Sequence, residues 1–246
     1  MEITTARVEI PQGDGSFGGY LARPAGDERL PGVIVYMEIF GINSHIRDVT
    51  ERVAREGYVA IAPDYFHRTG PGVEFGYDDA GMAAGMKLLS SLEAGEMIED
   101  AVATVAYLRG RGDTQGDRIG AMGFCIGGHM TYLAACATDI QASASFYGGG
   151  IAAPQGPGGA ASTVSRTSGI KGRILCLFGG QDAMIPGDQV DSIRSALGQA
   201  GVRHEVVVYD AADHGFHCDQ RASYDEAAAK DAWQRVVRMF AEELKP

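Results

Sequence analysis

The chain lacks the features that mark several large classes of protein. It has only four cysteines among 246 residues, and no two of them form a CxxC pair, so their spacing indicates neither a disulfide framework nor a zinc site. No segment approaches the ~20 apolar residues of a membrane span. The first residues, MEITTARVEIPQ, show no basic start followed by an apolar run. We therefore expect a cytoplasmic protein without disulfides, membrane segment or secretion signal.

Basic residues are also scarce. Lys and Arg number 21 against 32 Asp and Glu, which gives a formal net charge of −11. Nucleic-acid binding usually needs a basic face, so we expect no nucleic-acid partner. Apolar residues make up 45% of the chain, as is typical of a folded globular protein, and the 35 glycines predict many tight turns.

Short apolar or β-branched runs recur along the chain. Most are continuous rather than alternating, as is typical of strands buried on both faces. They lie at 33–37, 58–63, 118–124, 142–148, 173–179 and 204–210. In two earlier runs, 6–10 and 17–24, apolar and polar residues alternate more clearly. These runs predict an antiparallel hairpin at one edge of a sheet.

Helical patterns fall between these runs. Apolar stripes predict helices over 94–109 and 226–244, and weaker patterns predict helices over 44–56 and 187–200. Strands that alternate with helices indicate a mostly parallel, twisted sheet of about seven to eight strands with helices on both faces, the α/β-hydrolase type of α/β fold.

The segment 148–170 is rich in Gly, Pro, Ser and Ala. Strands of parallel character continue on either side of it, so we interpret it as a long loop or flap rather than a linker. The whole chain, 1–246, is then a single domain.

The strongest chemical signal is the sequence G-F-C-I-G at 123–127. A buried strand runs into it and an apolar helix over 126–138 runs out, which is the context of a nucleophile elbow with Cys125 as the nucleophile. A side chain at either glycine would collide with the neighbouring strand or helix. The turn leaves the backbone N–H of Ile126 free to bind an oxyanion. The alternative interpretation is a buried packing cysteine.

A thiolate nucleophile needs a base, and the base needs a carboxylate to orient it. Asp182 follows the strand at 173–179, and His214 follows the strand at 204–210. Both side chains are therefore predicted at the same sheet edge as Cys125, in the chain order nucleophile, acid, histidine.

Other residues near these positions compete for the same roles. Asp213 adjoins His214, but neighbouring loop residues rarely point at each other. His217 competes with His214 for the role of the base. The position of His129, one helical turn beyond Cys125, favours a packing role for it. An interpretation of His214, His217 and Cys218 as metal ligands lacks a second ligand pair at a recognisable spacing. We therefore expect neither a metal nor a cofactor.

The chain resembles the dienelactone hydrolase family, the carboxymethylenebutenolidase-like branch of the α/β-hydrolases, over nearly its whole length. The resemblance rests on G-F-C-I-G-G, on G-V-I-V at 32–35 running into E-I-F-G at 38–41, on A-P-D at 62–64, and on the Asp182 and His214 loops. It implies an α/β-hydrolase fold and a triad of Cys125, Asp182 and His214.

The resemblance also implies roles for residues after the first long strand. Glu38 would take the thiol proton when substrate binds, and the backbone N–H of Ile39 would join that of Ile126 in the oxyanion hole. Read on its own, Glu38 is a carboxylate within the apolar run VIVYMEIFG, where an unpaired charge is costly and a functional role is favoured. The alternative is an exposed residue just past the strand end.

Three aromatic residues are predicted to contact the substrate. Phe40 and Phe216 are expected to line the pocket, with ordinary packing as the alternative. Tyr147 resembles a binding residue of the family, and an aromatic core position is the alternative for it.

The two arginines that hold the substrate carboxylate in the family are not matched. Cys218 stands four residues beyond His214, at one of these positions, and no arginine occurs from 69 through 108. Arg68 is nearby but is not aligned. We therefore expect hydrolysis of a small ester or lactone other than dienelactone, through a thioester on Cys125, by a monomer or homodimer. The alternatives are action on a thioester or another acyl bond, and a non-catalytic thiol protein that senses redox state or binds a ligand.

Overall fold

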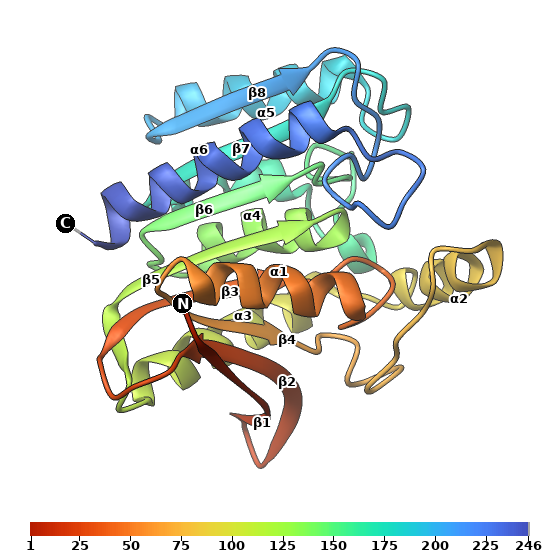
Figure 1. Cartoon of the computed structure of the whole chain (residues 1–246). Coiled ribbons are helices and arrows are strands. Elements are labelled where there is room, and N and C mark those ends of the chain that lie inside the picture. Colours follow the sequence, from red (N-terminus) through yellow and green to blue (C-terminus); the bar gives the residue numbers. More distant parts are fainter. Residues whose placement is uncertain (246) are drawn as a thin grey trace.

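Eight strands form one sheet in the order β1-β2-β4-β3-β5-β6-β7-β8 (Figure 1). The computed structural model describes residues 1–245. The strands are β1 (Ile3–Gln12), β2 (Gly15–Pro24), β3 (Leu30–Tyr36), β4 (Val59–Pro63), β5 (Thr114–Phe124), β6 (Ala142–Phe146), β7 (Arg173–Gly179) and β8 (His204–Tyr209). Pairing is antiparallel from β1 to β2 and from β2 to β4, and parallel everywhere else. The predicted α/β-hydrolase fold and its edge hairpin are confirmed.

Helices cover both faces of this sheet. One face carries α1 (Ser44–Arg55) and α6 (Glu226–Leu244), and the other carries α3 (Ala94–Gly110), α4 (Ile126–Ala137) and α5 (Gly187–Gln199) (Figure 1). This covering leaves β4 and β6 buried along their whole length. Burial on both faces explains why those strands are continuous apolar runs in the sequence. No helix within residues 1–245 is long and apolar enough to cross a membrane.

The helix α2 (Asp79–Leu89) was not predicted. Its only buried residues are Gly81 and Gly85, while Met82 and Met86 are exposed, so the sequence shows no apolar stripe there. The small residues let the helix lie close to the main chain: a Cβ at Gly85 would stand 2.6 Å from the carbonyl oxygen of Ile39. This contact holds α2 above the carboxyl end of β3.

The segment predicted as a long loop folds back against α4. It contains two short 3-10 turns, η1 (Pro157–Gly159) and η2 (Thr163–Gly169), and a bridge between Gln155 and Ala161. The second turn packs against both α4 and α5.

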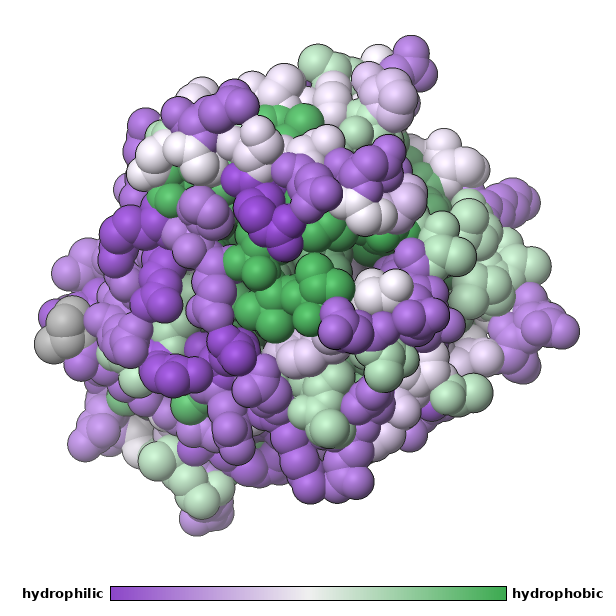
Figure 2. Space-filling view, turned by 90° about the horizontal axis from the view of Figure 1, so that it is seen from above, coloured by the Kyte–Doolittle hydropathy of each residue, from purple (hydrophilic) through white to green (hydrophobic). Residues whose placement is uncertain are grey.

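The last strand, β8, forms the edge of the sheet opposite the hairpin. Seen from that side, apolar residues gather in the middle of a mostly hydrophilic surface (Figure 2). Val206 and Val207 of β8 are half-buried and Val208 is exposed.

Candidate active site

Cys125 occupies a sharp turn between β5 and α4. Its backbone has φ 57° and ψ −122°, a region that non-glycine residues rarely adopt. The flanking glycines allow this turn. A Cβ at Gly123 would lie 2.2 Å from the carbonyl oxygen of Gly127, and one at Gly127 would lie 2.3 Å from that of Tyr36. The close packing therefore fixes the thiol at the carboxyl end of the central strands.

Replacing Gly127 by alanine is expected to lower the free energy of unfolding by about 3 kcal/mol or more, because the backbone of β3 leaves no space for a methyl group. Urea denaturation measures this loss. Gly95→Ala is the matched control: nothing lies within 4 Å of its added Cβ, and it sits in α3. Its stability should be unchanged or raised by up to ~1 kcal/mol. Equal stabilities of the two variants would contradict the tight turn.

Asp182 and His214 meet at the ends of neighbouring strands. Nδ1 of His214 lies 2.7 Å from Oδ2 of Asp182, and both side chains are buried. The other oxygen of Asp182 accepts from the backbone N–H of Met184 at 2.9 Å, which fixes the carboxylate. Asp213 instead accepts from the backbone N–H of His214 at 2.6 Å. Asp182 is therefore the carboxylate that orients the ring.

The charge of His214 follows from these contacts. Burial alone would lower its pKa, but the hydrogen bond to Asp182 and the nearby Cys125 outweigh burial and raise the pKa to about 10. Nδ1–H donates to the carboxylate, so Nε2 is the atom left for proton transfer. Nε2 has no partner of good hydrogen-bond geometry among residues 1–245.

The rival residues lie elsewhere. His217 is fully enclosed, with its ring stacked on Phe124 at 5.0 Å and tilted toward Trp233 at 6.1 Å. Burial holds its pKa well below the usual range. Cys218 is grouped with His45 and Asp219 rather than with His214 and His217. The structure thus does not assemble the metal-ligand set considered from the sequence.

Two backbone N–H groups are available beside the thiol. β3 and β5 are neighbours, with Tyr36 opposite Gly123, so the residues that follow these strands lie close together. Among residues 1–245 the N–H groups of Ile39 and Ile126 donate to no backbone carbonyl. The first N–H groups of a helix have no partner within the helix. The assignment of these two N–H groups to an oxyanion hole stays a prediction.

Glu38 is buried, with 1% of its surface exposed, so it is not an exposed residue past the strand end. Its Oε1 pairs with Nη1 of Arg221 at 3.1 Å, and its Oε2 accepts from the hydroxyl of Tyr77 at 3.2 Å. The Arg221 guanidinium lies 5.8 Å from the ring centroids of Phe40 and Tyr77. These contacts compensate a carboxylate that would otherwise be costly to bury.

Arg221 is the residue near the site that sequence reasoning missed. A buried carboxylate demands a cation, but nothing in the sequence shows which of the 21 basic residues supplies it. The available signal is Gly215, which has φ +83° and whose added Cβ would stand 2.4 Å from Nη1 of Arg221. The glycine after the histidine thus makes room for the arginine.

A cavity of about 350 Å³ opens over Cys125 and His214. Its remaining wall is apolar or uncharged: Leu89, Leu92, Ile126, His129, Gly149, Gly150, Gln155, Gly156, Pro157 and Met184. The end of α2 and the segment 148–170 supply most of this wall. A larger cavity of about 450 Å³, between the β1–β2 hairpin and Glu74, contains none of the predicted site residues.

The three aromatic residues predicted to bind substrate are not among those that line this cavity. Tyr147 is fully buried with its ring edge-on to His214 at 5.1 Å, and Phe216 packs behind it at 5.2 Å. Phe40 packs edge-on against Tyr77 at 4.6 Å. The expectation that Phe40 and Phe216 line the pocket is thus not supported. The wall is supplied instead by segments whose folding the sequence did not reveal.

His129 ties the segment 148–170 to α4. Its Nδ1 lies 2.8 Å from the carbonyl oxygen of Gly149, and its Nε2 lies 2.7 Å from the hydroxyl of Thr163. The carbonyl can only accept, so Nδ1–H donates to it and Nε2 accepts from Thr163. One turn further along, the hydroxyl of Tyr132 bonds Thr167 at 2.6 Å. His129 therefore has a packing role, and its two hydrogen bonds position the segment 148–170 that forms part of the cavity wall.

The burial of His129 makes stability depend on pH. Burial, partly offset by the hydrogen bond to Gly149, lowers its pKa to about 4. The unfolded chain binds this proton near pH 6.5, so stability is lost as the pH falls from 6.5 toward 4. Between pH 7 and pH 5 the loss from this residue is expected to be about 2 kcal/mol. Urea denaturation at both pH values should show His129→Gln losing less than the wild type; equal losses would contradict this.

The arrangement defines a class of protein. A cysteine on a strained strand–helix turn that lines one cavity with a histidine paired to a buried aspartate is an arrangement typical of α/β-hydrolases. The model of the dienelactone hydrolase family matches residues 17–244. The chain belongs to the dienelactone hydrolase family.

Individual relatives agree with this assignment. The chain is 46% identical to a "Putative carboxymethylenebutenolidase" of Synechocystis sp., with 100% of this chain and 99% of the relative covered. It is 36% identical to a protein of the same description from Salmonella typhimurium, with 98% and 88% covered. A crystal structure titled "Putative Dienelactone Hydrolase" from Klebsiella pneumoniae superposes with a TM-score of 0.89, at 35% identity, with 98% and 100% covered. The protein is a carboxymethylenebutenolidase-like enzyme of the ester and lactone hydrolase class.

Proposed function

We propose that the protein hydrolyses a small, uncharged and largely apolar ester or lactone through a thioester on Cys125. One observation carries this proposal: the thiol on the strained turn and the His214 ring, oriented by Asp182 at 2.7 Å, line the same cavity. A nucleophile, a base and a carboxylate that orients the base are the requirements for covalent acyl transfer.

The first half of the reaction forms the thioester. When substrate binds, Glu38 takes the proton of the Cys125 thiol. The thiolate attacks the carbonyl carbon, and the electron pair of the C=O bond moves to oxygen, where the N–H groups of Ile39 and Ile126 hold the oxyanion. The intermediate collapses, the C–O bond breaks, and the leaving alkoxide takes a proton from His214. With a pKa of about 10, His214 carries that proton at neutral pH.

The second half releases the acid. His214, now neutral, takes a proton from a water molecule, and the hydroxide attacks the thioester carbonyl. The second oxyanion collapses and expels the Cys125 thiolate, which recovers its proton from Glu38. Protons balance over the cycle, because His214 and Glu38 both return to their starting forms.

Glu38→Gln tests the proton transfer. Glutamine keeps the shape of the side chain but cannot take the thiol proton, so kcat/KM is expected to fall by about 10²–10³-fold. Steady-state hydrolysis of an activated ester measures the effect, with circular dichroism to check that the variant is folded. Glu74→Gln is the control, because Glu74 pairs with Arg7 and Arg47 near the surface and should leave the rate unchanged. Full activity of Glu38→Gln would contradict the role given to this carboxylate.

The cavity wall indicates the substrate class. Apart from Cys125 and His214, the lining residues carry no charge at neutral pH, since burial lowers the pKa of His129 to about 4. The nearby guanidinium of Arg221 is engaged by Glu38. A panel of uncharged esters, uncharged lactones and a dienelactone carboxylate should therefore show higher kcat/KM for the uncharged members. A preference of tenfold or more for the carboxylate would contradict this substrate class. A preference for thioesters would instead identify a thioester as the bond that the enzyme hydrolyses.

A further inference from the structure

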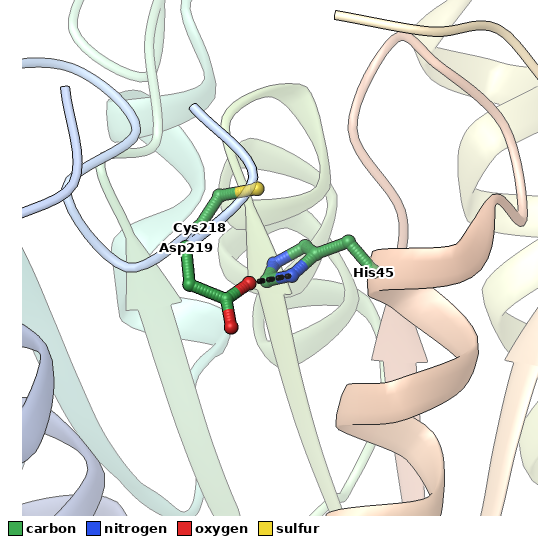
Figure 3. A group of neighbouring side chains, drawn as sticks. All are labelled: His45, Cys218 and Asp219. Carbon is green, nitrogen blue, oxygen red and sulfur yellow. Dashed lines mark ion pairs between the residues drawn. The ribbon is translucent and has the colours of Figure 1, made fainter. Parts of the chain in front are cut away.

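Three side chains that the proposed reaction does not use lie together beside the active site. His45 is at the start of α1, and Cys218 and Asp219 are in the loop after β8 (Figure 3). One ligand atom from each lies within 4.8 Å of the other two. Nδ1 of His45 is 3.9 Å from Oδ1 of Asp219. Figure 3 shows the imidazole reaching from α1 toward the thiol and the carboxylate.

The burial of this group points to a ligand. His45 and Cys218 are buried, with 1% and 0% of their surfaces exposed. Nε2 of His45 has no hydrogen-bond partner among residues 1–245, although buried polar atoms are nearly always paired. The side chain of Asp219 is 67% exposed. The group is therefore closed toward the core and open toward solvent through the carboxylate.

We propose that His45, Cys218 and Asp219 bind a divalent transition-metal ion of the zinc type. Imidazole nitrogen, thiolate sulfur and carboxylate oxygen form a donor set that zinc prefers. In a tetrahedral site such donors stand about 3.3–3.6 Å apart, so the three side chains need to close in by about 1 Å. Water from the open side completes the tetrahedron.

Charge and proton balance are satisfied. As the sulfur–metal bond forms, the Cys218 thiol releases its proton to solvent. The thiolate and the Asp219 carboxylate then neutralise the dication, and the imidazole of His45 binds as the neutral ring. No oxidation or reduction takes place.

The site adjoins residues that hold Glu38. Tyr77, whose hydroxyl donates to Glu38 at 3.2 Å, also contacts the thiol of Cys218. The backbone carbonyl of Cys218 accepts from the N–H of Arg221 at 3.1 Å. Drawing the Cys218 sulfur onto a metal therefore moves the loop that carries Arg221, and metal binding is expected to slow ester hydrolysis reversibly. Only this last consequence rests on the proposed function; metal binding does not.

Titration with Co²⁺ tests the site on the full chain after treatment with a chelator. A cobalt–thiolate bond gives an intense charge-transfer absorption, and Zn²⁺ should abolish it by displacement. Cys218→Ala should remove the band. Asp219→Ala, a change at the surface that leaves the core untouched, should weaken Co²⁺ binding by at least about tenfold, and so should His45→Ala.

The competing thiol is that of Cys125, which lies beside His214. Cys125→Ala is therefore the matched control and should keep the full band. A band that survives Cys218→Ala or disappears in Cys125→Ala would overturn the proposal, as would no band at millimolar Co²⁺ in the folded wild-type protein. Because the readout is absorption, this result is independent of whether Cys125 proves to be the nucleophile.

Discussion

Cys125→Ala is expected to abolish ester hydrolysis, with kcat/KM reduced by about 10⁴-fold or more. The methyl group cannot form a thioester, and the residual rate is that of the oxyanion hole and binding alone. Alanine fits the turn no worse than cysteine does, so the variant should fold. Hydrolysis of an activated ester, measured beside a urea denaturation curve, separates a loss of chemistry from a loss of structure.

Cys136 supplies the control for this experiment. It lies on the same helix, α4, and is half-buried, but it does not line the cavity. Burial raises the pKa of its thiol to about 12, so it is a poor nucleophile at neutral pH. Cys136→Ala should keep the wild-type rate. Comparable activity in Cys125→Ala and Cys136→Ala would remove Cys125 from the mechanism.

Asp182→Asn is expected to lower kcat by about 10³–10⁴-fold with little change in binding. The amide can donate to Nδ1, which would leave the proton on Nε2, the atom that must accept a proton from water. The carboxylate also holds the pKa of His214 up, so the variant should lose the protonated histidine that assists the leaving group.

Asp213→Asn is the matched control for this prediction, since Asp213 is next in sequence to His214 and accepts only from its backbone N–H. Asparagine can accept the same bond through its side-chain oxygen, so the rate should stay within about threefold of wild type. A larger loss in Asp213→Asn than in Asp182→Asn would reverse the assignment of the orienting carboxylate.

Much of the sheet could be predicted because each strand leaves a local signal. Burial on both faces makes β4 and β6 read as unbroken apolar runs, and the crowded turn at Cys125 demands glycines at fixed positions. Strand ends in a parallel sheet then bring Asp182 and His214 to one edge. These inferences need only short stretches of sequence and the geometry of parallel strands.

The cavity wall could not be predicted, because it depends on contacts between distant segments. Leu89 and Leu92 reach the cavity only because Gly85 lets α2 pack on the backbone of Ile39. The segment 148–170 reaches it through the bonds of His129 to Gly149 and Thr163. Each contact joins residues that are far apart in the sequence, so no local sequence pattern indicates it.

The same reason explains the missed partner of Glu38. From the sequence, position 218 was considered only as the place of an arginine for the substrate carboxylate, whereas the loop after β8 turns so that Arg221 reaches the carboxylate of Glu38. The turn depends on Gly215 at φ +83° and on backbone bonds from Cys218 to Gly215 and from Arg221 to Cys218. A ligand or partner supplied by an irregular loop is set by its three-dimensional path, and residue spacing alone does not give it.

The most direct test of the central claim is intact-protein mass spectrometry of samples quenched during hydrolysis of an activated acetate ester. An activated ester needs no acid for its leaving group, so Asp182→Asn should still acylate while its deacylation is slow. One acyl group is predicted to accumulate on this variant, to map to Cys125 after proteolysis, and to be absent when Cys125→Ala is added. Turnover without any adduct, or an adduct on another residue, would contradict a thioester on Cys125.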